Sequence, residues 1–400
     1  MAELAISMAS VAPPEAFDEA GFVAEVRAFL TRALTENLRE AGRATIGVHA
    51  DIAACRIWHR RLYERGWIAP AWPRAWGGAG WGPRQRFVFD RECAANDAPI
   101  LFAGGLRSVG PLLIEMGTPW QRTRYLPAIL SGDDLWCQGF SEPGAGSDLA
   151  AISTRAERRG DHYVVNGSKI WTTGAHHANR MFAIVRTQTG ERRQQGLTFL
   201  LLDMASRGLS VAPILGLAGE HEFNQVFFDD VRVPVAGRVG AENEGWAVAK
   251  RLMQLARSNN TPAALLRRVL RRAAQSVAAV DVDQAPWLRR RLAALEIELQ
   301  AFEQLEQAAL PSGRPSGADQ TTPSMLKLIG SELHQKIAEL ILEAAGPYAA
   351  AALGAMGLTG DDVDAGAGAM GKHLSVRAAT IYSGTSETQR NVIARQLLAF

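Results

Sequence analysis

The spacing of apolar residues changes twice along the chain. From about Ala16 to Leu130 apolar residues recur at helical spacing, as in FVAEVRAFLTRALTENL, so a helical zone is predicted. Residues 67–83, WIAPAWPRAWGGAGWGP, interrupt this zone with many Trp, Pro and Gly residues. Such a composition does not favour regular structure, and we expect an ordered aromatic loop there.

From Leu135 to about Pro234 the pattern becomes that of short β-strands. Runs such as NRMFAIVRT and GLTFLLLDM are separated by Gly, Asn and Asp turns. This arrangement is typical of a small antiparallel barrel or sandwich. The stretch RGDHYVVNG predicts a hairpin turn that leads into a strand ending at Asn166 and Gly167.

After Gly245 the helical spacing returns in long runs with arginines on one side and Leu and Ala on the other. That pattern favours a helical bundle with charged outer faces. The run RRVLRR, residues 267–272, is expected to be a solvated face or a subunit contact, ahead of nucleic-acid binding. Residues 311–324 are expected to form a surface connection between two bundle helices.

Composition narrows the classes of partner. The chain has 400 residues, 47% of them hydrophobic, which is enough for a large buried core. Its formal charge of +2, from 43 basic and 41 acidic residues, gives no general attraction to nucleic acid or to anionic membranes. The sequence shows neither an apolar run of roughly 18 residues nor a signal-peptide pattern, so we expect a cytoplasmic protein.

Metal binding is not expected from the Cys and His residues. Cys55, Cys93 and Cys137 are too few and too scattered for a metal site or a disulfide framework, and reduced core thiols are the plainer interpretation. His176 and His177 are adjacent, and adjacent residues on a strand point to opposite faces.

Two segments carry the chemical information of the β-rich zone. They are WCQGFSEPGAGSDLA, residues 136–150, and VNGSKIWTTGA, residues 165–175. A glycine-rich loop gathers backbone N–H groups in a small space, and such an array suits an anion or the electron-rich edge of a ring system. The hydroxyls of Ser141, Ser147 and Thr173 add donors, while Trp171 can stack on an aromatic cofactor. Taken singly, the loop is more often just a turn and the Trp more often core.

A third segment, IYSGTSETQRNVIAR at residues 381–395, forms a tight turn before a helix that begins near Ser386. With these three segments, and with QRFVFDRECAANDAP, GTPWQRTRYLPAILSG and FDDVRVP, the chain resembles the acyl-CoA dehydrogenase family of flavoproteins over nearly its whole length. The resemblance implies FAD held between the β-domain and the bundle, with an acyl thioester against the flavin.

The fold that the resemblance implies is α+β. Residues 1–134 would form an N-terminal helical domain, residues 135–240 a central antiparallel β-domain, and residues 241–400 a C-terminal four-helix bundle. Implied partners are an acyl-CoA or a carrier-bound acyl thioester, an electron acceptor that is a flavoprotein or oxygen, and further subunits in a homo- or hetero-oligomer.

The resemblance also assigns cofactor contacts residue by residue. Trp171 and Thr173 match positions that contact the isoalloxazine ring, and Thr385 and Glu387 match positions on the phosphate and adenosine side. The remaining matches are Gln138, Phe140, Ser141, Gly146 and Ser147. Many relatives also have an Arg-Gln-x-Phe motif that reaches FAD in a neighbouring subunit. Residues 288–302, LRRRLAALEIELQAF, stand in that region and lack the motif, so the resemblance does not carry that contact between subunits over to this chain.

The family's catalytic carboxylate is missing. The implied reaction removes the α-proton of the thioester with a carboxylate in a dry pocket, while the β-hydrogen leaves as hydride. Many relatives have that Glu where Ser383 stands, and another branch has it where Ala256 precedes Arg257. Losing a positioned base typically costs on the order of 10²- to 10⁴-fold in rate. The Ser383 hydroxyl has no adjacent base to activate it, but its backbone N–H can stabilise an enolate-like state.

Three hypotheses follow. Asp97 can act as a base recruited from the N-terminal domain, although a turn Asp is the plainer interpretation. Alternatively, the chain is a subunit without a base that works with a catalytic sister chain, or it is a flavin oxidase or monooxygenase that needs less of a base. Arg257 is either an interhelix ion pair or a contact to the acyl group or the CoA portion.

Overall fold

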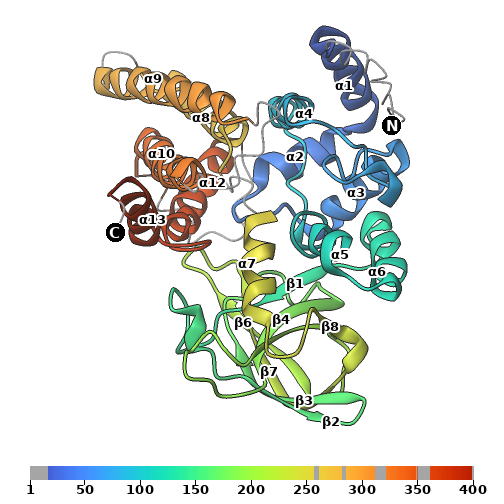
Figure 1. Ribbon diagram of the computed structural model, residues 1–400. Helices are drawn as coiled ribbons and strands as arrows, with labels where there is room; N and C mark the ends of the chain where they lie inside the picture. The colour runs from blue at the N-terminus through green and yellow to red at the C-terminus, as the bar shows by residue number, and fades with distance from the viewer. Residues whose placement is uncertain are drawn as a thin grey trace, which may run out of the picture.

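The computed structural model describes residues 17–255, 261–281, 285–310, 321–347, 349 and 361–398, with the backbone alone over 361–367. Figure 1 shows three parts: N-terminal helices, a β-domain below them, and C-terminal helices beside the first group. This arrangement confirms the α+β class and the order helices, sheet, helices.

Capping residues set the ends of several N-terminal helices. The Asp51 carboxylate accepts the Ala53 and Ala54 N–H groups where α3 begins, and Gly66 ends that helix with a left-handed φ of 77°. The helices of this part are α1 (Glu19–Ala33), α2 (Glu36–Ala44), α3 (Ile52–Arg65), α4 (Pro83–Ala95), the π-helical η2 (Gly104–Val109), α5 (Gly110–Met116) and α6 (Pro119–Ser131).

The aromatic loop at 67–83 is confirmed as ordered and largely irregular. It contains only the single short turn η1 (Arg74–Trp76). Trp72 is buried in the hydrophobic core of this part of the chain, and its indole N–H donates to the Leu106 carbonyl at 2.9 Å. The loop is therefore part of the core.

One eight-stranded sheet forms the β-domain. Its main path runs β6-β7-β3-β2-β4-β5-β8, and β1 pairs with β4. The strands are β1 (Trp136–Gly139), β2 (Arg155–Arg159), β3 (His162–Lys169), β4 (Arg180–Arg186), β5 (Leu197–Asp203), β6 (Leu209–Leu215), β7 (His221–Pro234) and β8 (Arg238–Val239). Most pairs are antiparallel, as expected, whereas β1 and β2 each pair with β4 in parallel.

The predicted hairpin joins β2 to β3, but its second strand does not end at Asn166 and Gly167. It continues to Lys169 through a register shift opposite β7 between Val165 and Gly167. A Cβ at Gly167 would lie 2.8 Å from the Thr154 Cα, so a glycine fits this close approach. The extra residues carry β3 toward Trp171.

The C-terminal helices are α7 (Gly245–Leu255), α8 (Ala263–Ala278), α9 (Pro286–Ala308), α10 (Thr321–Ala345), α12 (Asp361–Ser375), the short η5 (Val376–Thr380) and α13 (Ser386–Leu398). Most of them pack around α10, whereas α7 lies against α5, η2, β4 and β5. Helix α10 contacts α8, α9, α12 and α13, and its buried side chains include Leu333 and Ile337. The predicted surface connection at 311–324 lies mostly outside the described residues, and its last residues belong to α10.

The arginine run is not a solvated face as a whole. Arg268 is only 6% exposed, and the other three arginines bond within the chain, to groups that include Glu303, Asp97 and the Arg43 backbone. The reason is that α8 lies between α10, α9 and α4. Within the described part of the chain, no helix combines the length and apolarity needed to cross a bilayer, and the cytoplasmic location stays a prediction.

Candidate active site

A buried ion pair fixes the glycine-rich loop. The Lys169 ammonium donates to the Phe140 carbonyl at 3.1 Å, the Ile184 carbonyl at 2.7 Å and the Glu142 carboxylate at 2.7 Å. Glu142 also accepts the N–H and hydroxyl of Ser153 and the N–H of Thr154. Burial lowers the pKa of Lys169 to about 8 against the opposing charge of Glu142. The pair holds the start of the loop to the sheet.

The same pair orients the peptide that joins Phe140 to Ser141. In this trans peptide the carbonyl and the N–H point in opposite directions. Since the Phe140 carbonyl faces Lys169, the Ser141 N–H points away from the sheet interior. The Ser141 carbonyl accepts the Ile170 N–H at 2.9 Å. The loop and the Trp171 segment are therefore in direct contact.

The other residues predicted from the loop differ in exposure. The Phe140 ring is buried edge-on against Phe182 and Phe199, so the ring itself is not available to a ligand. Gln138, Gly146 and Ser147 are exposed. These three can meet a ligand without rearrangement of the core.

Trp171 stands out in the adjoining segment. Its side chain is 58% exposed, and its φ of 58° lies in the left-handed region, which is unfavourable for a bulky residue. Its ring meets Phe223 edge-on at 6.1 Å. Nearby, the N–H groups of Thr172 and Gly174 donate to the Asn224 and Glu222 carbonyls of β7, with the half-buried Thr173 between them. The structure thus holds a large exposed ring in a strained, anchored conformation.

The tail turn lies near β7 and begins α13. Burial, together with a smaller effect of the Glu222 charge, raises the pKa of Tyr382 to about 12, which places the Tyr382 hydroxyl within the electrostatic reach of β7. Ser383 is exposed with a φ of 56°. The Thr385 hydroxyl accepts the Thr388 N–H at 3.2 Å in the first turn of the helix, and Glu387 follows it on the surface.

Lys327 on α10 is a candidate that the sequence did not suggest. It is 8% exposed, and its ammonium has no hydrogen-bond partner among the described residues. Burial lowers its pKa, while the charge of Glu387 in the first turn of α13 opposes that effect. The Ser386 hydroxyl at the start of α13 is also buried without a partner in the described chain. A lone Lys in SMLKLIG gives no sequence signal because its burial depends on the packing of α10.

The remaining predicted residues fall elsewhere. Asp97 has a φ of 56° after α4 and makes ion pairs with Arg271 at 2.9 Å and with Arg43 at 3.7 Å. These contacts favour its interpretation as a structural residue, and its role as a base stays a prediction. Arg257 and Ala256 lie outside the described residues.

His176 and His177 do not lie on a strand, so the geometric expectation for them was wrong. They occupy the turn after Trp171, with ring centroids 3.9 Å apart, and His176 stacks on His221 at 3.8 Å. Burial, together with smaller effects of the charges of His177 and His221, lowers the pKa of His176 to about 4.

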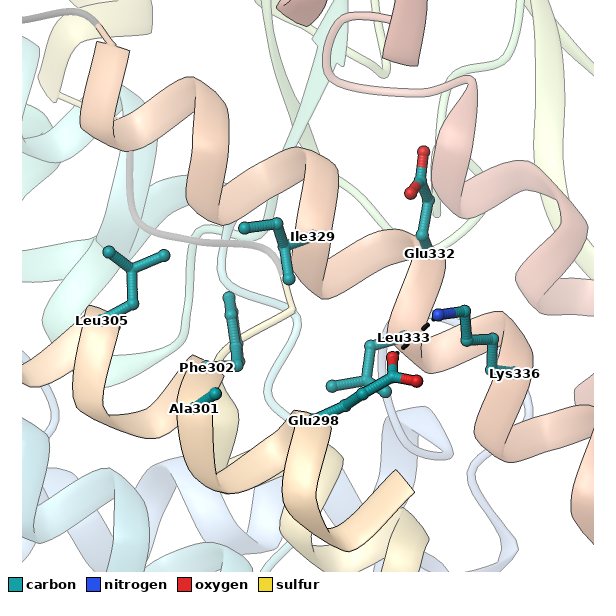
Figure 2. Close-up of a pocket in the computed structure, with 8 residues that line it drawn as sticks. All are labelled: Glu298, Ala301, Phe302, Leu305, Ile329, Glu332, Leu333 and Lys336. Carbon is teal, nitrogen blue, oxygen red and sulfur yellow. Dashed lines mark hydrogen bonds and ion pairs between the residues drawn. The ribbon is translucent and has the colours of Figure 1, made fainter. Parts of the chain in front are cut away.

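A groove of about 390 Å³ between α9 and α10 is separate from these segments (Figure 2). Phe302, Leu305 and Ile329 line it, and the Glu298 to Lys336 ion pair of 2.7 Å closes one end. No residue assigned above lines this groove.

Together, the three segments fit a cofactor with a flat ring and an anionic part. The exposed Trp171 offers a stacking face, and the Ser141 N–H offers a directed donor. At the other end, the buried Lys327 ammonium and the Ser386 hydroxyl lack partners within the described residues and suit phosphate oxygens. The geometry is thus compatible with the cofactor contacts expected from the sequence.

Comparison with protein families gives three consecutive matches. The acyl-CoA dehydrogenase N-terminal domain model matches residues 18–133, the middle domain model residues 137–231, and the C-terminal domain model residues 243–398. Among relatives, the acyl-CoA dehydrogenase IpdE1 of Mycobacterium tuberculosis (strain ATCC 25618 / H37Rv) is 35% identical over 391 residues. That alignment covers 94% of this chain and 97% of IpdE1.

Two solved assemblies are similar in structure. A chain of the Tcur3481-Tcur3483 steroid ACAD superposes with a TM-score of 0.81 at 28% identity, over 96% of this chain and 97% of that one. A chain of the ChsE4-ChsE5 complex from Mycobacterium tuberculosis gives the same TM-score of 0.81, identity of 28%, and coverage of 96% and 97%. Each of these assemblies is named for two different proteins.

Proposed function

Because the chain belongs to the acyl-CoA dehydrogenase family, we propose that it binds FAD and removes the α and β hydrogens of an acyl thioester. The observation that carries the proposal is the direct contact between the loop of Ser141 and the segment of Trp171, with the Trp171 ring exposed. The thioester is acyl-CoA or carrier-bound, and the electron acceptor is a flavoprotein or oxygen.

The proposed cofactor-binding residues form two groups. One group contacts the flavin ring, and the other contacts the phosphate and adenosine side. Trp171, Thr173 and the Ser141 N–H face the flavin ring, with Gln138, the Phe140 backbone, Gly146 and Ser147 beside it. Lys327 joins Thr385, Ser386 and Glu387 on the phosphate and adenosine side, where an ammonium complements phosphate charge. When bound, FAD supplies the acceptor for the hydride that leaves the β-carbon.

Ser383 is not proposed as the catalytic base, and its role would be to bind the thioester. Its backbone N–H, in the turn before α13, would hydrogen-bond the thioester carbonyl and so increase the acidity of the α-proton. The proton itself needs a carboxylate, and Asp97, the candidate within this chain, is held by Arg43 and Arg271.

A second candidate function is therefore a subunit that depends on a sister chain for its base. Two observations favour it. A Ser occupies the position of the missing Glu, and the two similar assemblies are each named for a pair of different proteins.

Anaerobic titration of the flavin-loaded protein with a panel of acyl-CoAs tests both functions. Bleaching of the flavin by this chain alone supports the complete dehydrogenase, and Asp97→Asn then tests the base: unchanged turnover removes Asp97 from the mechanism. Bleaching only after co-purification with a sister chain supports the dependent subunit. Flavin that stays oxidised under both conditions contradicts both functions, and rapid oxygen consumption by the reduced protein points to an oxidase.

A further inference from the structure

Two arginines of the RRVLRR run face inward. Arg268 Nη1 donates to the Ala98 carbonyl at 3.1 Å, and Arg272 Nη1 donates to the Arg43 carbonyl. They are four residues apart on α8 and so share one helix face. A guanidinium has five N–H donors, and each of these side chains uses one of them in the bond described. Most donors of both arginines therefore remain available to a ligand.

Lys372 on α12 adds a third cation at the same place. Its ammonium donates to the Ile46 carbonyl at 2.8 Å and has two further N–H donors. One turn earlier on α12, a Cβ at Gly368 would lie 3.6 Å from Arg272 Nη2. The Arg272 guanidinium therefore lies against the turn of α12 that precedes Lys372, and cations from two bundle helices converge there.

None of these three cations makes an ion pair with a carboxylate among the described residues. The acids whose charges act on them have other contacts, since Asp97 pairs with Arg271 at 2.9 Å and the Glu222 carboxylate accepts the Val48 N–H at 2.6 Å. Burial lowers the pKa of all three cations, that of Lys372 to about 8. Burying like charges together without a partner is unfavourable, so an anion among them would stabilise the fold.

A small cavity lies beside these cations, where α2, α8, α10 and α12 meet (Figure 1). Its volume of about 30 Å³ is close to that of one water in the liquid. Four cations line it, Arg43, Arg268, Arg272 and Lys372, and no acidic residue of the described chain does. Of the four, only Arg43 pairs with carboxylates within the described ranges. The remaining walls are apolar apart from Thr45.

We propose that this cavity binds a single chloride ion, which holds the bundle to the N-terminal helices. A monatomic halide is about as large as a water molecule, whereas an oxyanion carries several oxygens around a central atom and exceeds this volume. A water would fit as well, but it would leave the positive charge uncompensated. The chloride would accept charge-assisted hydrogen bonds from the free donors of Arg268, Arg272 and Lys372.

The inference goes beyond the proposed function. The lining of the cavity includes no residue of the Ser141 loop, the Trp171 segment or the tail turn. A chloride there would act on the packing of α8 and α12 against α2, and its binding can be measured without a substrate.

Thermal unfolding in sodium chloride and in sodium gluconate at equal ionic strength tests the site, because gluconate is too large for the cavity. The wild-type midpoint should be higher in chloride, and the difference should saturate with chloride concentration, as for a ligand that binds the folded state. Arg272→Gln and Lys372→Met should each lose most of this rise. Arg267→Gln removes the same charge from the same helix at a position bonded to Glu303, and it should keep the rise.

A second measurement uses the wild-type protein alone, so it stands even where a variant fails to fold. Crystals grown with bromide in place of chloride should give one anomalous peak in the cavity, beside Arg268 and Lys372. Absence of that peak overturns the proposal. Equal wild-type midpoints in the two salts, or a rise that both cavity variants keep, overturns it as well. A peak without a chloride-dependent midpoint is an adventitious ion only and equally contradicts the role given to chloride.

Discussion

At the scale of single residues, Lys169 connects the sheet to the candidate site. Its side chain is fully buried, and it holds both the Phe140 carbonyl and the Glu142 carboxylate. The direction of the Ser141 N–H depends on the first of these contacts. The pair therefore affects stability and ligand binding together.

Replacing Lys169 by Met leaves Glu142 buried without its cation, because no other ammonium or guanidinium pairs with it among the described residues. Breaking a buried pair in this way costs about 3–5 kcal/mol. Urea unfolding should show that loss for Lys169→Met, and Lys169→Met with Glu142→Gln should recover part of it. A single variant as stable as the wild type would contradict the role given to the pair.

Lys327 yields a second prediction, on cofactor affinity. If its buried ammonium meets the phosphates of FAD, Lys327→Met should weaken FAD binding by roughly ten- to a hundred-fold, the range of a hydrogen bond to a charged group. Fluorescence titration of the apoprotein measures the change. Lys336→Met is the matched control on the same helix, since Lys336 pairs with Glu298 on the surface. Equal affinities of the two variants would place the phosphates elsewhere.

Residue identity predicted part of this site. The Gly-rich loop, Trp171 and the tail turn were recognisable because their residue types and order are distinctive. Lys169 and Lys327 were not, since a Lys signals nothing until tertiary packing buries it. The ion pairs of Asp97 were equally hidden, because Arg271 and Arg43 lie far from it in sequence.

At the scale of elements, the turn after Trp171 brings three histidines together. His176 stacks on His221, contacts His177 and is bonded to the Asn224 side chain of β7. The turn therefore joins the proposed flavin-facing segment to β7 through stacked imidazole rings.

This cluster predicts acid sensitivity. The pKa of His176 is about 4 in the folded chain and about 6.5 when unfolded, so the unfolded chain binds more protons between these values. Its contribution to stability is complete above about pH 6.5 and is lost as the pH falls toward 4. Thermal unfolding across this range should show a falling midpoint, and His176→Asn should flatten the slope. The same slope in both proteins would show that other groups cause the acid loss.

The sequence predicted the type of most elements better than it predicted where a strand ends or which face of a helix is buried. The spacing of apolar residues indicated the helical zones, whereas β3 extends beyond Gly167 because the bulge keeps its pairing with β7. The RRVLRR run was assigned to a solvated face or a subunit contact from its charge alone. Arg268 and Arg272 instead reach backbone carbonyls of the N-terminal part, a contact that only the packing of α8 reveals.

At the scale of the whole molecule, the order of zones was sufficient to predict the architecture, because the period of apolar residues changes from helix to strand and back. The domain boundaries after residues 134 and 240 remain a proposal. Figure 1 shows the β-domain against both helical parts, and the candidate segments come from the β-domain and the C-terminal helices. A site assembled from distant segments in this way needed the resemblance to a known family as well as the pattern.

The central claim is that the Ser141 loop, the Trp171 segment and the tail turn together bind one FAD. Its most direct test is equilibrium binding of FAD to the purified chain, alone and with a sister chain, followed by visible flavin absorbance. The wild type should take up one FAD per site, and Trp171→Ala with Lys327→Met should lose it while keeping its circular dichroism. A folded wild-type protein that takes up no flavin under either condition would contradict the account.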